Sequence, residues 1–156
     1  MFRVAVITVS DRVHRGEYED LSGPRIRDLL LESSLEADVC LVVVPDEKPA
    51  IQQAITDCLD RDYIFTTGGT GLSFRDVTPE VTKEICDREI PGISEFLRRE
   101  SCSETRYAPL SRGFSGMKGK TIIVNFPGSV KAVSLYTRLM IPVMEHASKM
   151  ILGGKH

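Results

Sequence analysis

The chain alternates short, predominantly apolar runs with longer amphipathic segments. The apolar runs are rich in Val, Ile and Phe, which is typical of strands buried on both faces of a parallel sheet. Four such runs are predicted strands: residues 2–9, 37–44, 63–67 and 121–126. Between them, apolar residues recur three and four positions apart, as at Ile51, Ala54, Ile55 and Cys58. This spacing predicts helices that pack one face on the sheet.

Capping residues and prolines predict where several helices begin. Ser22 precedes Gly-Pro and Thr78 precedes Pro-Glu, so both are candidate helix caps. A long helical pattern covers residues 129–152, in which Pro142 predicts a kink or a new first turn. The stretch 101–119 is the least regular and predicts loops with short extended pieces.

The alternation of strands and helices predicts an α/β fold, a mostly parallel sheet with helices on both faces, in one domain covering residues 1–156. Right-handed crossovers bring all strand-to-helix loops to one edge of the sheet. Ligands of such sheets bind outside the carboxyl ends of the strands. The loops expected there are also the richest in Gly, Asp, Ser and Thr: residues 10–22, 45–47, 68–78 and 127–131.

Composition excludes several classes of function. Lys and Arg total 20 against 22 Asp and Glu, Trp is absent and aromatic residues are 6%, so we expect no nucleic-acid partner. The longest purely apolar stretch, residues 39–44, is far shorter than a membrane helix. No secretory signal precedes the first strand pattern, and the four cysteines form no C-x-x-C pair, so we expect a cytoplasmic protein with reduced thiols.

The segment Thr66–Gly71, Thr-Thr-Gly-Gly-Thr-Gly, carries the strongest local signal. Three glycines in four positions allow backbone N–H groups to approach an anion closely. The segment is neither a Walker A loop nor a dinucleotide fingerprint, because the residues that complete those motifs are missing. The alternative is an ordinary tight turn. A second anion site is predicted at 125–129, where a strand end meets a helix N-terminus.

Two aspartates, Asp46 and Asp76, follow strands that end at the same edge. A carboxylate beside a phosphate site repels the ligand unless a divalent cation lies between them, as Mg²⁺ does. Asp46 alone also fits a helix cap. Asp11 and Asp20 are further acidic candidates.

Missing motifs narrow the chemistry. The three histidines are scattered, and neither His-Glu-x-x-His nor Gly-x-Ser-x-Gly occurs. Without a strong nucleophile or base, positioning, cations and electrostatics must perform the reaction, which suits phosphoryl or nucleotidyl transfer.

Taken together, the motifs resemble the molybdenum cofactor biosynthesis family of the Mog type, the molybdopterin adenylyltransferases. The motifs that carry the resemblance, in chain order, are Ser10-Asp11-Arg12, Asp20-x-Ser22-Gly23-Pro24, Pro45-Asp46-Glu47, Thr66–Gly71, Arg75–Glu80, Glu89-x-Pro91-Gly92, Leu110-Ser111-Arg112 and Asn125-x-Pro127-Gly128. They span nearly the whole chain. The joined segment 66–80 is the most specific part. One departure follows Gly128, where many relatives have a polar residue and a second Pro, whereas this chain has Ser129-Val130.

The resemblance implies a three-layer α/β/α fold, usually in a homotrimer, and a reaction. The terminal phosphate of molybdopterin attacks the α-phosphate of Mg-ATP, giving adenylylated molybdopterin and pyrophosphate. It implies that Asp46 and Asp76 are catalytic and hold Mg²⁺. The residues assigned by resemblance to the nucleotide and its phosphates are Ser10, Asp11, Gly68, Gly69, Thr70, Gly71, Thr78, Glu80, Pro127, Gly128 and Ser129. The residues assigned to molybdopterin are Asp20, Ser22, Gly23, Ser101, Ser111 and Arg112. A molybdenum insertase is the implied partner.

Three alternatives to this enzyme stay open. A Moa B-type protein holds the pterin without adenylylating it, and its site motifs overlap with those quoted above. A scaffold like gephyrin acts through protein contacts, but it carries a second domain that this chain lacks. The CinA group also has a Gly-rich loop, and the segment Arg75–Pro79 favours the Mog type over it.

Overall fold

A computed structural model of the chain describes residues 1–154. The strands are β1 (Phe2–Val9), β2 (Ala37–Val44), β3 (Tyr63–Thr67), β4 (Arg88–Glu89), β5 (Ser115–Lys118) and β6 (Thr121–Phe126). The helices are α1 (Asp11–His14), α2 (Ser22–Glu32), α3 (Lys48–Asp57), α4 (Thr78–Ile85), α5 (Pro91–Ser101) and α6 (Val130–Ile151), with a 3-10 turn at Ala108–Leu110. The four apolar runs are thus confirmed as strands.

The strands form one six-stranded sheet in the order β2-β1-β3-β6-β5-β4. β1 pairs in parallel with β2 and β3, and β3 pairs in parallel with β6. β5 and β4 run antiparallel at the far edge. The mostly parallel sheet is therefore confirmed. β5 lies in the stretch 101–119, where we expected loops with short extended pieces, whereas β4 lies in an expected helix connection. Two and four residues are too short to show a strand periodicity.

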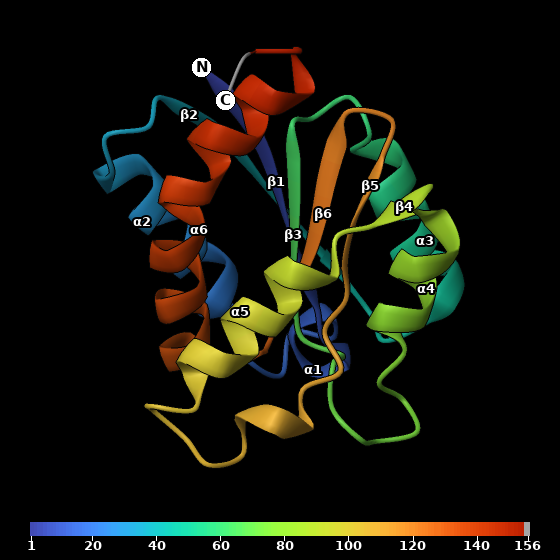
Figure 1. Cartoon of the computed structure of the whole chain (residues 1–156). Coiled ribbons are helices and arrows are strands. Elements are labelled where there is room, and N and C mark those ends of the chain that lie inside the picture. Colours follow the sequence, from blue (N-terminus) through green and yellow to red (C-terminus); the bar gives the residue numbers. More distant parts are fainter. Residues whose placement is uncertain (155–156) are drawn as a thin grey trace.

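Helices cover both faces of the sheet and make three layers (Figure 1). α2, α5 and α6 cover one face, and α3 and α4 cover the other. Alternate residues of each strand point to opposite faces, so Val4 and Val6 pack with α2 and α6, while Ala5 and Ile7 pack with α3. β1, β2, β3 and β6 are rich in apolar residues because each face of the sheet has its own core.

α6 continues through Pro142 without interruption, so the expected new first turn is wrong. Pro142 lies on the exposed side of α6. The buried stripe formed by Val133, Tyr136, Met140 and Met144 continues past it and holds the helix against the sheet despite the missing N–H. Within residues 1–154, no helix combines the length and the apolar character needed to cross a bilayer. The four cysteines are free thiols; Cys58 is buried, whereas Cys102 is exposed.

Candidate active site

The loops after β1, β2, β3 and β6 meet at the carboxyl edge of the parallel strands, as expected. From β1 the chain passes through α2 to β2, whereas β3 is reached through α3 on the opposite face. The order of the strands therefore reverses between β1 and β3, where open α/β sheets leave a crevice for ligands. In Figure 1, α1 and the loop after β3 lie together at this edge.

Asp11 and Asp46 connect two of these loops through reciprocal hydrogen bonds. The Asp11 N–H donates to Asp46 Oδ2 at 2.9 Å, and the Asp46 N–H donates to Asp11 Oδ1 at 3.0 Å. Asp46 is not a helix cap, because α3 begins at Lys48 with Glu47 in the cap position. The carboxylate is instead held at the crevice by backbone of the neighbouring loop.

Arg75 forms an ion pair with Asp11. Its Nε and a terminal guanidinium nitrogen donate to the two carboxylate oxygens of Asp11 at 3.0 and 2.8 Å. These hydrogen bonds lower the pKa of Asp11. Burial raises the pKa of Asp46, and the charges of Asp11 and Asp76 act in the same direction, against the Asp11 N–H bond. Three carboxylates thus crowd one edge, which favours a cation between them.

Asp76 and Asp46 each keep one carboxylate oxygen without a hydrogen bond. Asp76 Oδ2 accepts the Ser73 N–H at 2.9 Å, and Asp46 Oδ2 accepts the Asp11 N–H. Within residues 1–154, neither Oδ1 accepts a hydrogen bond from the protein, and no cluster of three or more His, Cys, Asp or Glu side chains is placed to hold a metal. The two free oxygens fit Mg²⁺, which usually takes one or two carboxylates and completes its shell with water and phosphate.

The Gly-rich loop packs directly on β1 and α4. Gly68 and Gly69 have φ of 98° and 69°, a left-handed conformation that favours glycine. A Cβ at Gly68 would lie 2.3 Å from the Val9 carbonyl oxygen, and one at Gly69 would lie 2.2 Å from Thr78 Oγ1. Because these residues have no side chains, the backbone of the loop passes closely between β1 and α4. The same property would let the backbone approach a ligand closely.

Thr78 fastens this loop rather than capping α4, so the predicted cap is wrong. Val77 occupies the cap position. The Thr78 hydroxyl donates to the Gly68 carbonyl at 3.1 Å, and its N–H donates to the Gly69 carbonyl at 3.2 Å. The Gly68 and Gly69 carbonyls therefore accept the two donors of Thr78, because the start of α4 lies against the glycine loop.

On the other side of Gly68 lies a cleft of about 390 Å³ at the N-termini of α2 and α6. Ser10, Ser22, Gly68, Gly128 and Ser129 are among the residues that line it. Ser129 caps α6 by accepting the Ala132 N–H at 3.2 Å. The first turns of two helices leave N–H groups near this cleft, which suits a phosphate. Thr67 fixes the adjoining turn by donating from its hydroxyl to the Pro127 carbonyl at 2.7 Å.

Asp20 binds within the protein at the start of α2. Its carboxylate accepts the Thr8 hydroxyl at 2.9 Å and the Gly23 N–H at 3.1 Å. The predicted Ser22 cap is wrong: Ser22 is the first helical residue, and Leu21 precedes it as the cap. Asp20 supplies the acceptor from two residues before the helix and still lines the 390 Å³ cleft.

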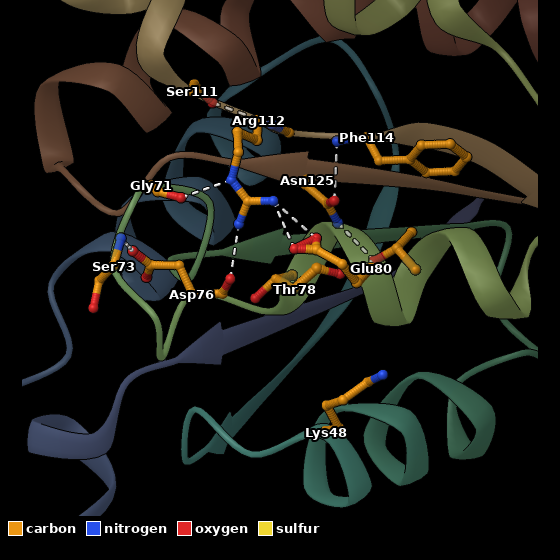
Figure 2. A network of polar contacts seen from close by, with 12 residues as sticks. Lys48, Gly71, Ser73, Asp76, Thr78, Glu80, Ser111, Arg112, Phe114 and Asn125 are labelled. Atoms are coloured by element: carbon orange, nitrogen blue, oxygen red, sulfur yellow. Dashed lines mark hydrogen bonds and ion pairs between the residues drawn. The ribbon is translucent and has the colours of Figure 1, made fainter.

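Arg112 and Glu80, assigned by resemblance to different substrates, form an ion pair with each other (Figure 2). Thr70 is buried, and its carbonyl accepts the Arg112 N–H at 2.8 Å. Ser111 is half-buried, with Oγ 3.4 Å from the Gly113 nitrogen. Ser101 is buried at the C-terminal end of α5 and lines no part of the 390 Å³ cleft.

Asn125 is the buried residue whose part in the site the sequence analysis missed. Its Nδ2 donates to the hydroxyls of Thr66 and Thr82, both at 2.9 Å, and its Oδ1 accepts the Phe114 N–H at 3.0 Å. These bonds join β3, α4 and the segment before β5 beneath the Gly-rich loop. The signal was present, because the chain's single asparagine interrupts an otherwise apolar predicted strand.

Comparison with known proteins finds relatives that match nearly the whole chain. Residues 5–146 match the family model described as a probable molybdopterin binding domain. The molybdopterin adenylyltransferase of Helicobacter pylori strain J99 is 36% identical over 155 residues, which cover 97% of this chain and 88% of that protein. The molybdenum cofactor synthesis protein cinnamon of Drosophila melanogaster is 42% identical over 149 residues, which cover 94% of this chain but 25% of that longer protein.

A solved structure has the same architecture. The molybdopterin biosynthesis enzyme MoaB of Thermus thermophilus superposes with a TM-score of 0.89 at 42% identity, covering 98% of both chains. The family match covers far more than half of the chain, and its sequence relatives cover the crevice loops described above. The chain therefore belongs to the molybdopterin-binding domain family of molybdenum cofactor biosynthesis proteins.

Proposed function

We propose that this protein adenylylates molybdopterin with Mg-ATP. A terminal phosphate oxygen of molybdopterin forms a bond to the α-phosphorus of ATP, the bond from that phosphorus to the β-phosphate bridging oxygen breaks, and pyrophosphate leaves. The observation that carries the proposal is the pair of carboxylates, Asp46 and Asp76, each with one free oxygen beside the glycine loop. The adenylyltransferase relative from Helicobacter pylori supports it.

The chain's own residues supply placement and charge rather than a nucleophile. Asp46 and Asp76 would hold Mg²⁺, which neutralises phosphate charge when bound. The Gly69 backbone N–H and the first turn of α6 offer donors to phosphate oxygens, whereas the Gly68 N–H already donates to the Phe126 carbonyl at 3.2 Å. Arg75, paired with Asp11, keeps a cation at the entrance. Together these groups orient two polyanions for in-line attack.

The test is formation of the adenylylated product from molybdopterin, ATP and Mg²⁺, followed by mass spectrometry. Asp46→Asn and Asp76→Asn keep the shape of each side chain but remove its charge, so we expect each to abolish turnover while molybdopterin binding largely survives. Asp57→Asn is the matched control, because Asp57 is an exposed residue on α3 that accepts only from Gln53. Normal turnover in both site variants would refute the metal-carboxylate role.

A second candidate function is pterin binding without adenylyl transfer, and the similarity to the MoaB structure is the reason to consider it. It predicts that the wild-type protein binds molybdopterin and forms no adenylylated product at any Mg²⁺ concentration. The same assay therefore separates the two functions.

We extend the proposal to a homotrimer in the cytoplasm that passes its product to a molybdenum insertase. An apolar groove of about 690 Å³ between α6, α5 and β5 supports self-association, because exposed apolar area of this kind is a common feature of interfaces. Ile93, Met117, Val143 and Met150 are among its lining residues. Sedimentation equilibrium tests the trimer, which requires three times the 17.4 kDa chain mass.

A further inference from the structure

Arg112 bonds to three separate points of the site (Figure 2). Its Nε donates to the Gly71 carbonyl at 2.8 Å, and one terminal nitrogen donates to the Asp76 carbonyl at 2.7 Å. The other terminal nitrogen lies 2.6 and 2.9 Å from the two carboxylate oxygens of Glu80. The Arg112 backbone N–H adds a bond to the Thr70 carbonyl. The Arg112 side chain therefore connects Gly71 and Asp76 with Glu80, which lies in the first turn of α4.

The segment bridged by Arg112, residues 71–76, has little packing of its own. Leu72 is 69% exposed and Phe74 is 100% exposed. Inside the segment, the Asp76 N–H donates to the Ser73 carbonyl and the Ser73 N–H donates to Asp76 Oδ2, both at 2.9 Å. A loop without apolar burial keeps its shape through polar contacts. The position of the Asp76 carboxylate therefore depends on polar contacts, which are the Arg75–Asp11 pair inside the segment and the Arg112 bonds to the Gly71 and Asp76 carbonyls.

The residues that follow Arg112 anchor it to the body of the fold. The Gly113 carbonyl accepts from the Arg98 guanidinium of α5 at 2.7 Å, and the Phe114 N–H donates to buried Asn125. Arg112 is thus fixed to the sheet at its backbone and to the loop at its side chain. Arg112 therefore ties the backbone at Asp76 to the packed body of the fold.

This arrangement requires a guanidinium. Its planar fork directs donors in several fixed directions, whereas a Lys ammonium is a single point of charge and cannot reach the Gly71 and Asp76 carbonyls together with Glu80. All three of its nitrogens already donate within the protein. Glu80 balances the charge and holds the fork in place.

We propose that Arg112 is a positioning residue for the metal-binding carboxylate Asp76, and that its side chain does not recognise the pterin. Glu80 serves the same purpose by holding Arg112, not by contacting nucleotide. This inference rests on the proposed adenylyltransferase function, but it also predicts a property of the unliganded protein.

The first experiment measures that property. Hydrogen exchange by mass spectrometry is compared for wild type, Arg112→Lys and Glu80→Gln without substrates. Peptides covering residues 71–77 should exchange faster in Arg112→Lys and, to a smaller extent, in Glu80→Gln, which keeps one oxygen acceptor. Arg99→Lys is the matched control, because Arg99 is an exposed α5 residue bonded to its neighbour Glu100. Unchanged exchange at residues 71–77 in folded Arg112→Lys would overturn the positioning role.

The second experiment separates positioning from recognition by steady-state kinetics of adenylylation. Arg112→Lys should lower kcat by about 10- to 100-fold, as a small misplacement of a reacting group does. It should also raise the Mg²⁺ concentration needed for half-maximal rate, while KM for molybdopterin stays within about twofold. A raised KM for molybdopterin with unchanged kcat would instead assign Arg112 to the pterin and overturn the inference. If wild type forms no product, the proposed function fails, and the exchange measurement still decides whether Arg112 holds the loop.

Discussion

The buried amide of Asn125 offers the sharpest test of how the site is held together. The side chain is 2% exposed and makes three hydrogen bonds, to the Thr66 and Thr82 hydroxyls and from the Phe114 N–H. Asn125→Ala removes all three at once. Thr82 keeps its bond to the Thr78 carbonyl, but Thr66 and the Phe114 N–H lose the partner that the amide gave them.

The expected cost follows from these contacts. A hydrogen bond contributes about 1 kcal/mol net, so three contribute about 3 kcal/mol, and an N–H left without its acceptor brings the loss to about 3–4 kcal/mol. For a chain of this size, that loss corresponds to a fall in Tm of about 10 °C. The loss is a large part of the total stability of about 5–15 kcal/mol typical of a domain.

Urea denaturation followed by circular dichroism, at fixed protein concentration, measures this difference in the free energy of unfolding. Gln53→Ala is the control, because Gln53 is an exposed amide with one bond, to Asp57 in the next turn of α3, and its loss should cost less than about 0.5 kcal/mol. If Asn125→Ala and the control lost the same stability, the amide would not join the elements beneath the glycine loop, and the reasoning would fail.

Three further predictions concern the loop, the core and the sheet edge. Gly69→Ala should abolish adenylylation and lower stability, because the new Cβ would lie 2.2 Å from Thr78 Oγ1 in a backbone with φ of 69°; turnover and thermal melting measure both. Tyr63→Phe should cost about 1 kcal/mol of unfolding free energy, because the buried hydroxyl donates to a carbonyl of α6; chemical denaturation measures it. The Gly119 N–H bond lowers the pKa of Asp87, so its stabilisation is present above the unfolded pKa and is lost as pH falls through the lower folded value. Asp87→Asn should therefore be less stable than wild type at neutral pH, and the difference should shrink toward about pH 2, as acid titration of unfolding would show.

Each of these has a matched control. Gly92→Ala adds a Cβ with no atom within 4 Å and should change neither turnover nor folding. Tyr107→Phe alters an exposed ring and should be neutral. For Asp87→Asn, the control is wild type measured at the same pH values. Loss of function in Gly92→Ala to the degree seen for Gly69→Ala would mean that added volume in general, not the close approach to Thr78, causes the defect.

The apolar runs were enough to predict the sheet. Strand side chains alternate between two faces, and a strand with consecutive apolar residues has to be covered on both, so Val4–Ile7 and Tyr63–Phe65 already implied helices on both sides. The antiparallel edge depends on pairing more than on local propensity, because residues 115–118 pair with β6 and residues 88–89 pair with β5. Short extended pieces were expected within residues 101–119, but their position was not predicted, nor was the strand at residues 88–89.

The candidate site was also predictable only in part. The order of residue types along the chain placed Asp11, Asp46 and Asp76 after strands, and the topology of a parallel sheet was enough to bring them to one edge. The helix caps were mispredicted because other contacts engage these residues. The Thr78 hydroxyl donates to the distant Gly68 carbonyl, and Asp20, two residues before α2, accepts the Gly23 N–H at the start of that helix.

By itself, the sequence determined the fold class and the acidic, glycine-rich composition of the loops that meet at one edge of the sheet, because these follow from local periodicity and from residue type. Only the tertiary structure decided which side chains form hydrogen bonds and ion pairs with one another. Arg75 lies 64 residues from Asp11, Arg112 lies 32 from Glu80 and Asn125 lies 43 from Thr82, and no local pattern specifies such pairs. The Arg112 guanidinium, assigned to a substrate by resemblance, is bonded to the Gly71 and Asp76 carbonyls, since packing the strands side by side brings these distant positions within hydrogen-bond distance.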